Sequence, residues 1–358
     1  MVEGKVISIG NVAYVLGMNP KKLHRWYQEV LSGYSQAITS GQIGKHDLRV
    51  RDKGIEKVIK VPILKEEHLG SYMAIDEKTI DGECYSILSN RESGKIALMA
   101  NTLKTKYLVK LLGSFDNKMQ VKSLTRDMAQ NYEWLGRQSF MNAYQVADKF
   151  HVIKHALESL QAIRIRYRQQ ELEKRRKAKE DFYDEQQAKK WEAHIDRKEF
   201  KKQPFKYTET QHPNGDSTLQ LLARSRGLLF KLPGEWSDHQ KQRAQILFDI
   251  YPEIQLAYSL IVELRQWYRK TKKSVELIIK EKKILLWLEK VNDVYIYELD
   301  NLSYLLKNHL PFILNYFRKN ETNAAAEALN SQIQRFVNIN YGARNQDFFL
   351  FRLSTYFS

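Results

Sequence analysis

Three aspartates lie near the ends of segments that have the composition of buried β-strands. Asp76 follows an apolar run, Asp127 lies near the end of segment 121–128, and Asp148 near the end of segment 143–150. A carboxylate inside a sheet is costly unless it is paired, solvated or bound to a metal. Two carboxylates from neighbouring strands, with a third from a helix, can hold two divalent cations, and hard oxygen ligands suit Mg²⁺ or Mn²⁺. Such a metal pair activates a water or a 3′-hydroxyl and stabilises the leaving oxygen of a phosphodiester.

A helical segment near the C-terminus offers the third acid. Residues 323–339 have an apolar face at helical spacing, formed by Leu329, Ile333, Phe336 and Val337. The opposite face holds Glu327, Asn330, Ser331 and Gln334. Glu327 stands among the small residues of "TNAAAEALN", which would let this helix approach the sheet and a nucleic acid closely. On pattern alone, an ordinary solvated glutamate is the alternative.

The elements that position these acids follow from the spacing of apolar and turn residues. Short runs rich in β-forming residues, broken by Asp81-Gly82 and Ser93-Gly94, predict three consecutive antiparallel strands at 71–80, 83–90 and 94–101. The pattern then predicts a helix at 102–115, a strand at 121–128, a helix at 129–140, a strand at 143–150 and a long helix from His151. The order βββαβαβα predicts an α/β fold with a mixed sheet.

The N-terminal residues 5–31 predict two short helices around a turn. Gly17 breaks the first helix, Asn19 caps the second, and Pro20 suits its first position. The predicted second helix exposes the basic residues Lys21, Lys22 and Arg25 and buries Leu23, Trp26, Tyr27 and Val30. This pattern is typical of a DNA-binding helix-turn-helix, with two packed helices of no DNA role as the alternative. Residues 36–70 carry turn residues and mixed charges, and we expect a linker there.

The segment after the last predicted strand is helical and dense in charge. Residues 164–206 hold 15 Lys and Arg against 9 Asp and Glu, so they predict a solvated helix or a stretch that faces DNA. From Leu219 to about Leu310 the pattern is helical throughout. Trp267, beside basic residues, and Trp236 are candidates for stacking on an unpaired base, and core packing is the more common fate of a tryptophan.

Composition limits the classes of protein. The 358 residues carry a formal net charge of +16, which favours a polyanionic partner such as nucleic acid over a mere solubility trait. The single cysteine, Cys84, excludes a disulfide framework and a cysteine-based zinc finger. The first residues do not have the pattern of a signal peptide, and no window approaches a membrane span. We therefore expect a cytoplasmic protein without a membrane partner.

Several segments together resemble one known family. They are "MAIDEKTI", "SLTRDMAQNYEW", "VADKFHVIKHALESLQAIR", "ARSRGLLF" and "TNAAAEALNSQIQRFVNINYGARN". In content, order and spacing they are similar to the DDE transposases of the ISL-three family of bacterial insertion sequences, over about residues 72–354. The resemblance implies an RNase H-like catalytic core that is interrupted by a large helical insertion. It also implies Asp76, Asp127 and Glu327 as the three catalytic carboxylates, which would bind two Mg²⁺ or Mn²⁺ ions.

The expected organisation combines this resemblance with the pattern. It comprises a helix-turn-helix segment (1–35), a linker (36–70), the first part of the core (71–164), a mostly helical insertion (165–310), and the catalytic helix with a basic-aromatic tail (311–358). The expected partners are double-stranded DNA, as inverted-repeat ends and as target, and a second copy in a homodimer or larger synaptic complex. Such a protein is expected to associate with the bacterial nucleoid.

Other residues are candidates for additional roles. Asp148 is an alternative to Asp127 as second metal ligand; Asp127 is preferred because its strand is expected to lie beside the first strand. His151 and His155, one helical turn apart, have the spacing of zinc ligands, but without a third ligand nearby a structural or DNA-facing role is favoured. The expected DNA contacts beyond residues 1–35 are Lys149, His151, Lys154, Arg224, Arg226, Trp267, Arg335 and Arg344.

The sequence departs from the family pattern in two places. Family members often carry an N-terminal cysteine-rich zinc-binding segment, which one cysteine cannot form, so the helix-turn-helix recognises DNA ends alone or with an accessory DNA-binding protein. Ala324, Ala325 and Ala328 stand around Glu327 where "NG" and a glycine are common. A non-catalytic DNA-binding protein derived from a transposase and a structure-selective nuclease on the same core therefore remain alternatives.

Overall fold

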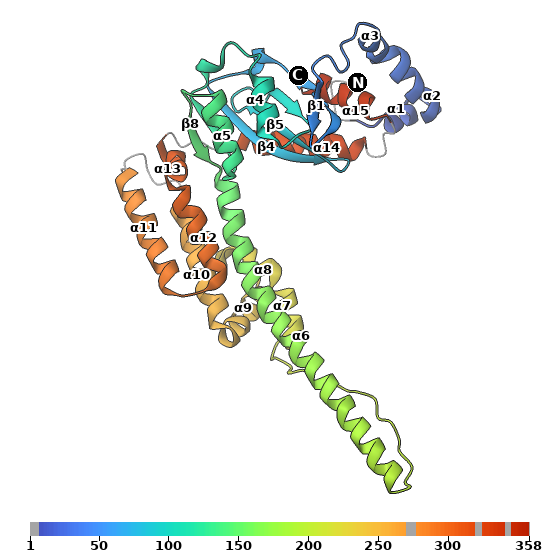
Figure 1. Cartoon of the computed structure of the whole chain (residues 1–358), viewed down its shortest axis with the longest axis vertical. Helices are drawn as coiled ribbons and strands as arrows, with labels where there is room; N and C mark the ends of the chain where they lie inside the picture. The colour runs from blue at the N-terminus through green and yellow to red at the C-terminus, as the bar shows by residue number, and fades with distance from the viewer. Residues whose placement is uncertain (1–6, 270–276, 319–323, 341–344, 358) are drawn as a thin grey trace. The chain divides into compact units, whose positions relative to one another are not determined.

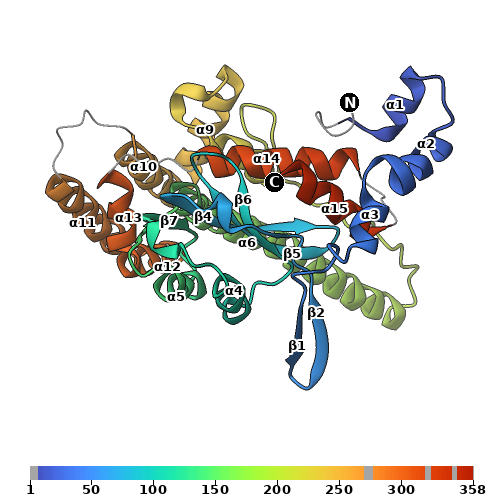
Figure 2. The same cartoon turned by 90° about the horizontal axis from the view of Figure 1, so that it is seen from above.

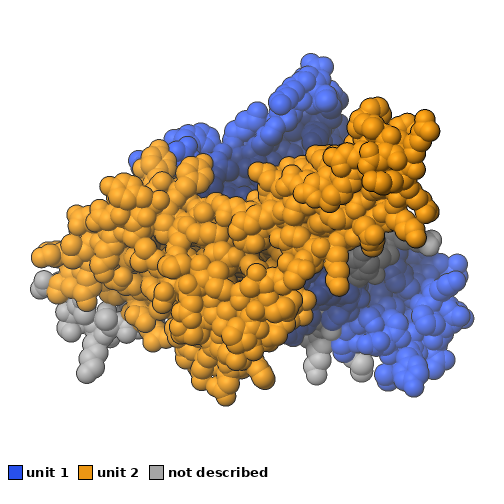
Figure 3. Space-filling model, turned by 90° about the horizontal axis from the view of Figure 1, so that it is seen from below, with its two compact units in different colours: residues 1–151, 311–358 blue, residues 152–310 orange. Residues whose placement is uncertain are grey.

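The chain divides into two compact units, each described here by itself (Figures 1 and 3). The computed structural model describes residues 7–269, 277–318, 324–340 and 345–357. Unit 1 comprises residues 1–151 and 311–358, and unit 2 comprises residues 152–310. Unit 2 therefore interrupts unit 1 in the sequence, close to where the large insertion, 165–310, was expected.

A mixed β-sheet forms the centre of unit 1 (Figure 2). Within the described residues it has six strands in the order β3-β6-β5-β4-β7-β8. Their bounds are Ile63–Leu64 (β3), Tyr72–Ile80 (β4), Glu83–Asn90 (β5), Ile96–Ala100 (β6), Ser123–Arg126 (β7) and Tyr144–Ala147 (β8). Neighbours among β4, β5 and β6 are antiparallel, whereas β7 lies parallel to β4 and β8 parallel to β7. The predicted order of strands is confirmed, and the fold is the expected RNase H-like α/β arrangement.

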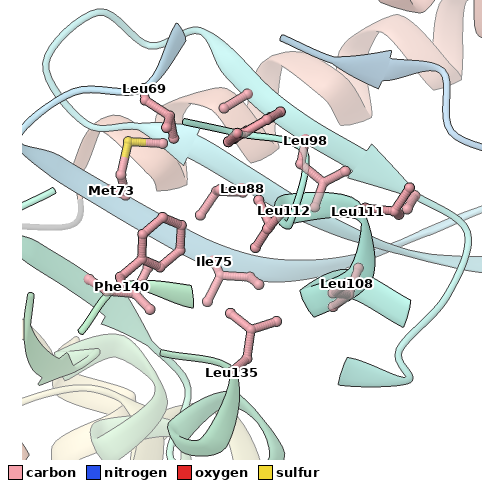
Figure 4. Packing of buried hydrophobic residues seen from close by; sticks show 14 of the residues in the cluster. Leu69, Met73, Ile75, Leu88, Leu98, Leu108, Leu111, Leu112, Leu135 and Phe140 are labelled. Atoms are coloured by element: carbon pink, nitrogen blue, oxygen red, sulfur yellow. The ribbon is translucent and has the colours of Figure 1, made fainter. Parts of the chain in front are cut away.

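Helices α4 (Thr105–Leu112) and α5 (Gln130–Ser139) cover one face of this sheet. Because side chains alternate along a strand, Met73 and Ile75 of β4 point into this layer, whereas Ala74 and Asp76 face the other way. Figure 4 shows the resulting core, which includes Leu69, Met73, Ile75, Leu88, Leu98, Leu108, Leu111, Leu112, Leu135 and Phe140.

Helices α14 (Ala324–Ile339) and α15 (Gln346–Tyr356) cover the opposite face (Figure 2). The predicted apolar face of α14 is confirmed: Leu329, Ile333, Phe336 and Val337 are buried and pack against strand residues such as Ile87 and Met99. Sequence positions more than two hundred residues after the first strand thus return to the central sheet. A helix placed in this way brings its polar face to the rim of the sheet.

The N-terminal segment forms three short helices in unit 1. They are α1 (Ile9–Val15), α2 (Pro20–Trp26), which continues as a π-helical turn (Tyr27–Leu31), and α3 (Tyr34–Thr39). Asn19 caps α2, since its side chain accepts hydrogen bonds from the Lys21 and Lys22 amides, as predicted. Leu23 and Tyr27 are buried as expected, but Trp26 and Val30 are 47% and 53% exposed. The reason is that this small bundle packs on α15 through Phe348, a partner that helical periodicity does not indicate.

The expected linker at 36–70 contains regular structure. It holds the end of α3, a hairpin of β1 (Leu48–Asp52) and β2 (Ile55–Ile59), and β3, which pairs with β6 as an edge of the central sheet. The expectation of a linker was therefore wrong for most of this segment. Charged and apolar residues alternate on both sides of Lys53-Gly54, which is a pattern typical of a β-hairpin. The mixed charges of the segment led to the prediction of a linker instead.

Unit 2 consists of helices and begins within α6 (Lys149–Ile195). Its other helices are α7 (Thr218–Arg224), α8 (Arg226–Phe230), α9 (Asp238–Ile250), α10 (Pro252–Trp267), α11 (Leu277–Asp293) and α12 (Tyr297–Asn308). Helix α13 (Leu310–Arg318) starts at the boundary between unit 2 and unit 1 and lies mostly in unit 1. Beyond Gln170, α6 is largely exposed, and the returning chain contacts it through Phe205, which packs on Phe182 and Tyr183. No described helix is both long and apolar enough to cross a membrane.

Candidate catalytic site

Strand register brings three predicted acids together in unit 1. In the parallel pair β4 and β7, Ala74 lies opposite Thr125, so Asp76 and Asp127 each lie two residues further along adjacent strands. In the next parallel pair, Arg126 lies opposite Ala147, so Asp127 and Asp148 are the next residues on both chains. Asp127 and Asp148 therefore stand where β7 and β8 end, and Asp76 lies beside Asp127 within the longer strand β4. The three aspartates differ in the groups that surround them and in their exposure to solvent, and these differences distinguish their roles.

Asp76 faces α14 because of its place in the strand. Its neighbour Glu77 points to the opposite face, where it accepts a hydrogen bond of 2.7 Å from the Tyr132 hydroxyl of α5. The Asp76 carboxylate instead accepts a hydrogen bond of 2.5 Å from the Asn330 side-chain amide of α14 and one of 2.8 Å from the Glu77 backbone amide. The strand period thus assigns Asp76, and not Glu77, to the site.

His151 lies among the three acids. Its Nε2 is 3.6 Å from Asp76 Oδ1 and 4.0 Å from Asp148 Oδ2, and its Nδ1 is 3.7 Å from Asp127 Oδ1. The side chain is positioned by the first turn of α6, directly after β8. His151 was expected to face DNA; its contacts with the acids are a feature that sequence reasoning missed. Its spacing from Asp148 was a usable signal, but its proximity to Asp76 required the tertiary structure.

The electrostatics of the cluster favour the ionised form of Asp76. Burial opposes ionisation of Asp76 most strongly, but hydrogen bonds from His151, Glu77 and Asn330 together hold its pKa below the usual value. For His151, burial is the largest influence and opposes protonation, but the three nearby carboxylates together raise its pKa above the usual value. The cluster thus places an ionised Asp76 and two further aspartates around one imidazole.

Asp127 and Asp148 differ in their access to solvent. The side chains of Asp76 and Asp127 are 24% and 31% exposed, whereas that of Asp148 is 6% exposed. Asp148 Oδ1 accepts a hydrogen bond of 2.9 Å from the Phe150 backbone amide, so this side chain caps the start of α6. Capping gives Asp148 a structural function, and the exposure of Asp127 fits its preferred place as second ligand.

A buried arginine, Arg126, contacts the backbone of Asp127. The Arg126 side chain is fully buried, and its Cζ lies 4.6 Å from the centroid of the Phe312 ring. Its guanidinium donates a hydrogen bond of 2.8 Å to the backbone carbonyl of Asp127. It also donates to the side chains of Gln145 and Glu133, and burial is the main reason that its pKa falls to about 10. A charged group buried at this position is held by several partners, and it restrains the backbone that carries Asp127.

The third predicted acid is positioned only in part. Glu327 belongs to α14, one turn before Asn330, and its side chain lies outside the described residues. Arg344 also lies outside them. Within the described part of the chain, no group of three or more His, Cys, Asp or Glu residues is arranged to hold a metal ion. The Glu327 assignment therefore stays a prediction.

One family model, that of the ISL-three DDE transposases, matches residues 73–353 and is described as transposase. The chain belongs to the ISL-three transposase family. The resemblance seen in the sequence is thereby confirmed. No curated protein and no solved structure matches the chain. An ISL-three transposase processes nucleic acid, so DNA is its substrate.

The basic residues predicted to contact DNA are distributed over both units of this transposase. Lys21, Lys22 and Arg25 are exposed on α2, Arg335 is exposed on α14, and Lys154 and Arg226 are also exposed. Lys149 is half-buried, and Arg224 is exposed but donates to Asp216. These DNA contacts stay predictions.

The two stacking candidates are engaged within unit 2. Trp267 is half-buried and its indole Nε1 donates 3.1 Å to the Lys280 carbonyl. Trp236 donates 2.8 Å to the Leu228 carbonyl and stacks on Tyr258. Both indoles are used in packing, which is the alternative that the sequence left open for them.

Proposed function

We propose that this transposase cuts DNA strands at the inverted-repeat ends of its element and joins the 3′-hydroxyl ends to a target. The observation that carries the proposal is the register of β4 and β7, which sets Asp76 and Asp127 side by side at the rim of the sheet. Helix α14 contacts the same rim through Asn330 and carries Glu327 one turn away. Strand transfer requires two ends held together, so we propose a dimer or larger complex.

The donor set fits divalent metal ions. Asp76 and Asp127 present partly exposed carboxylate oxygens, and Asp76 is held in its ionised form, which is the form that binds Mg²⁺ or Mn²⁺. We propose Asp76, Asp127 and Glu327 as ligands of two ions. Bound there, such ions would lower the pKa of the attacking hydroxyl or water and neutralise charge on the leaving oxygen.

The remaining groups of the site orient these ligands. The Asn330 amide and the Glu77 backbone hold the Asp76 carboxylate in one orientation. Arg126 restrains the Asp127 backbone, and Asp127 Oδ1 accepts 2.5 Å from the Met128 amide. His151 lies between both acids and balances their charge. Pre-organised ligands of this kind reduce the reorganisation that catalysis requires.

The proposal is tested with the purified chain and duplexes taken from the DNA that flanks its coding region. We expect Mg²⁺-dependent nicks at the ends and, when a labelled target duplex is supplied, joined products. Asp76→Asn and Asp127→Asn should each abolish both reactions. Asp81→Asn is the matched control, because it removes an exposed carboxylate from the turn after the same strand, and Asn tolerates the positive φ of 49° there.

The outcomes separate the alternatives. Nicks without joined product would indicate a nuclease, and binding without nicks would indicate a non-catalytic DNA-binding protein. Full cleavage in EDTA, or by Asp76→Asn, would contradict the proposed site.

A further inference from the structure

The hairpin of β1 and β2 is a separate two-stranded ribbon in unit 1. It pairs with no other described strand and extends beyond the central sheet (Figure 2). Lys53 and Gly54, with φ of 49° and 83°, form the tight turn at its tip, since a two-residue type I′ turn requires positive φ at both positions. The ribbon has a defined register from Leu48↔Ile59 to Asp52↔Ile55.

The base of the ribbon is anchored in the core of unit 1. Ile59 is buried, and Leu48 and Val50 pack against the same apolar cluster as α4. Asp47 pairs with Lys60 at 3.3 Å where the two strands leave the unit. At the outer end of β1, Asp52 forms an ion pair with Lys104, which lies just before α4. The ribbon is therefore held in one direction at its base and near its tip, and its exposed side chains can meet a partner.

The ribbon carries cations along its length that form no ion pair with the rest of the described chain. Arg49, Arg51, Lys53 and Lys57 are exposed and have no ion-pair partner among the described residues. Of the two acids in the ribbon, Asp52 is already paired with Lys104, and Glu56 lies opposite Arg51 in the register. Two apolar side chains, Ile55 at 68% and Val58 at 50% exposure, lie between these cations.

The cations are distributed on both faces and at the tip. Cross-strand register puts Arg49 and Arg51 on one face with Val58 and Glu56, whereas Lys57 shares the other face with Val50. A flat acidic surface would meet one face only. A DNA major groove, about 12 Å wide, admits a two-stranded ribbon and presents phosphates on both of its walls.

We infer that the β1–β2 ribbon is a DNA-binding element that enters the major groove of a duplex. Arg49, Arg51, Lys53 and Lys57 contact the phosphate walls, and Val58, which shares a face with Arg49 and Arg51, lies against base edges. An apolar side chain at that depth contacts thymine methyl groups, so the ribbon contributes to sequence preference as well as affinity. The inference rests on the proposed function only in that DNA is the substrate.

Binding measurements at several salt concentrations test the phosphate contacts. The probes are a fluorescent duplex from the flanking DNA and a scrambled duplex. Arg49→Gln/Arg51→Gln should weaken binding about tenfold, and it should reduce the slope of log K against log salt by about 2, since each phosphate contact contributes about 0.9. Lys282→Gln/Lys283→Gln is the matched control, because it removes the same charge from exposed positions of α11 in unit 2.

A cross-link tests the location of the ribbon. In a Cys84→Ser background, a photoreactive label at Ile55→Cys should attach to the duplex. The same label at Ile278→Cys, a position with 71% exposure against 68% at Ile55, should attach much less. Circular dichroism of each variant verifies that it is folded.

The outcomes distinguish this inference from the proposed function. Unchanged affinity and slope in Arg49→Gln/Arg51→Gln, equal losses in the Lys282 and Lys283 control, or equal cross-linking at both cysteines would overturn the ribbon's role and leave the catalytic proposal standing. Cross-links to a second copy of the chain and not to DNA would also overturn it, in favour of strand pairing between proteins. Failure of the wild-type chain to bind any duplex would overturn both.

Discussion

At the residue scale, solvent exposure separates three similar carboxylates. Asp127 and Asp148 directly follow the ends of β7 and β8, and Asp76 lies beside Asp127 within β4. Asp76 and Asp127 are partly exposed, whereas Asp148 is nearly buried and caps α6. Two acids are thus available to a ligand, and one stabilises the helix that carries His151.

A substitution of Asp148 should affect stability more than catalysis. We expect Asp148→Asn to retain strand cleavage within a few-fold, because asparagine is also a good helix cap and the three proposed metal ligands remain. Asp148→Ala should lower the free energy of unfolding of unit 1 by about 1 kcal/mol, the usual contribution of an N-cap. Urea unfolding and a strand-cleavage assay measure the two effects. Wild-type cleavage by Asp127→Asn together with complete loss in Asp148→Asn would reverse the ligand assignment.

Removal of the Asn330 amide should weaken metal use without unfolding the protein. Asn330→Ala deletes the 2.5 Å hydrogen bond to Asp76, so the carboxylate is no longer held in one orientation. Loss of a group that orients a metal ligand commonly costs about 10–100-fold in metal affinity or activity. The Mg²⁺ concentration for half-maximal cleavage should therefore rise. Gln334→Ala, exposed on the same helix, is the control, and an equal effect there would argue against an orienting role for Asn330.

At the element scale, two helices bring distant parts of the sequence to the sheet. α14 returns to β4 and supplies Asn330, and α6 begins where β8 ends and supplies His151. In unit 2, one buried acid ties elements together in a similar way. Asp216, with its side chain 1% exposed, accepts hydrogen bonds from Arg224 of α7 and, at 2.8 Å, from Arg243 of α9.

Asp216 should make the stability of unit 2 sensitive to acid. Burial raises its pKa, but the hydrogen bonds from Arg243 and Arg224 outweigh burial, and its pKa lies below the usual value. Its stabilising contribution is therefore present above the unfolded-state pKa of about 3.9 and is lost as the pH falls through the lower folded-state value.

The corresponding substitution measures this effect. Asp216→Asn should lower the free energy of unfolding by about 2–3 kcal/mol at neutral pH, and the difference from wild type should shrink below about pH 4. Asp238→Asn, which changes a fully exposed acid at the start of α9, is the control and should have little effect. A difference that stays constant from neutral pH into the acid range would contradict the ionic origin of the stabilisation.

At the scale of the whole molecule, the chain has two separately packed units. Unit 1 is assembled from both ends of the sequence around the sheet, and unit 2 is formed by helices between them. Each contains fully buried residues, such as Leu108 in unit 1 and Leu247 in unit 2. Separate cores generally unfold as separate cooperative units.

Urea unfolding should therefore show two transitions. Leu108→Ala should shift only the transition of unit 1, and Leu247→Ala only that of unit 2, each by about 2–5 kcal/mol. Tryptophan fluorescence reports mainly on unit 2 through buried Trp287, because Trp26 and Trp134 of unit 1 are already exposed, and far-UV circular dichroism follows the whole chain. A single transition that both substitutions shift equally would show that the units unfold together.

The sequence predicted much of the core and part of the site. Strands, turns and the apolar face of α14 are local patterns, and Asp81-Gly82 or Ile333 show them directly. The pairing of His151 with Asp76 and of Asn330 with Asp76 was not accessible, because it depends on residues far apart in the chain. Trp26 and Val30 were predicted to be buried, but the actual partner of their helix, Phe348, leaves them exposed.

By itself, the sequence determined the order of the elements, the family, and the acids that could bind metal, because spacing and residue type encode local structure. Only the tertiary structure decided which acids reach solvent, which groups orient them, and that residues 48–59 form a basic ribbon. The reason is that register between strands, and the return of α14 to the sheet, arise from burial of apolar faces across the whole of unit 1. The segment around His151 shows both: its sequence marks the end of a strand, and the fold sets its imidazole among three carboxylates.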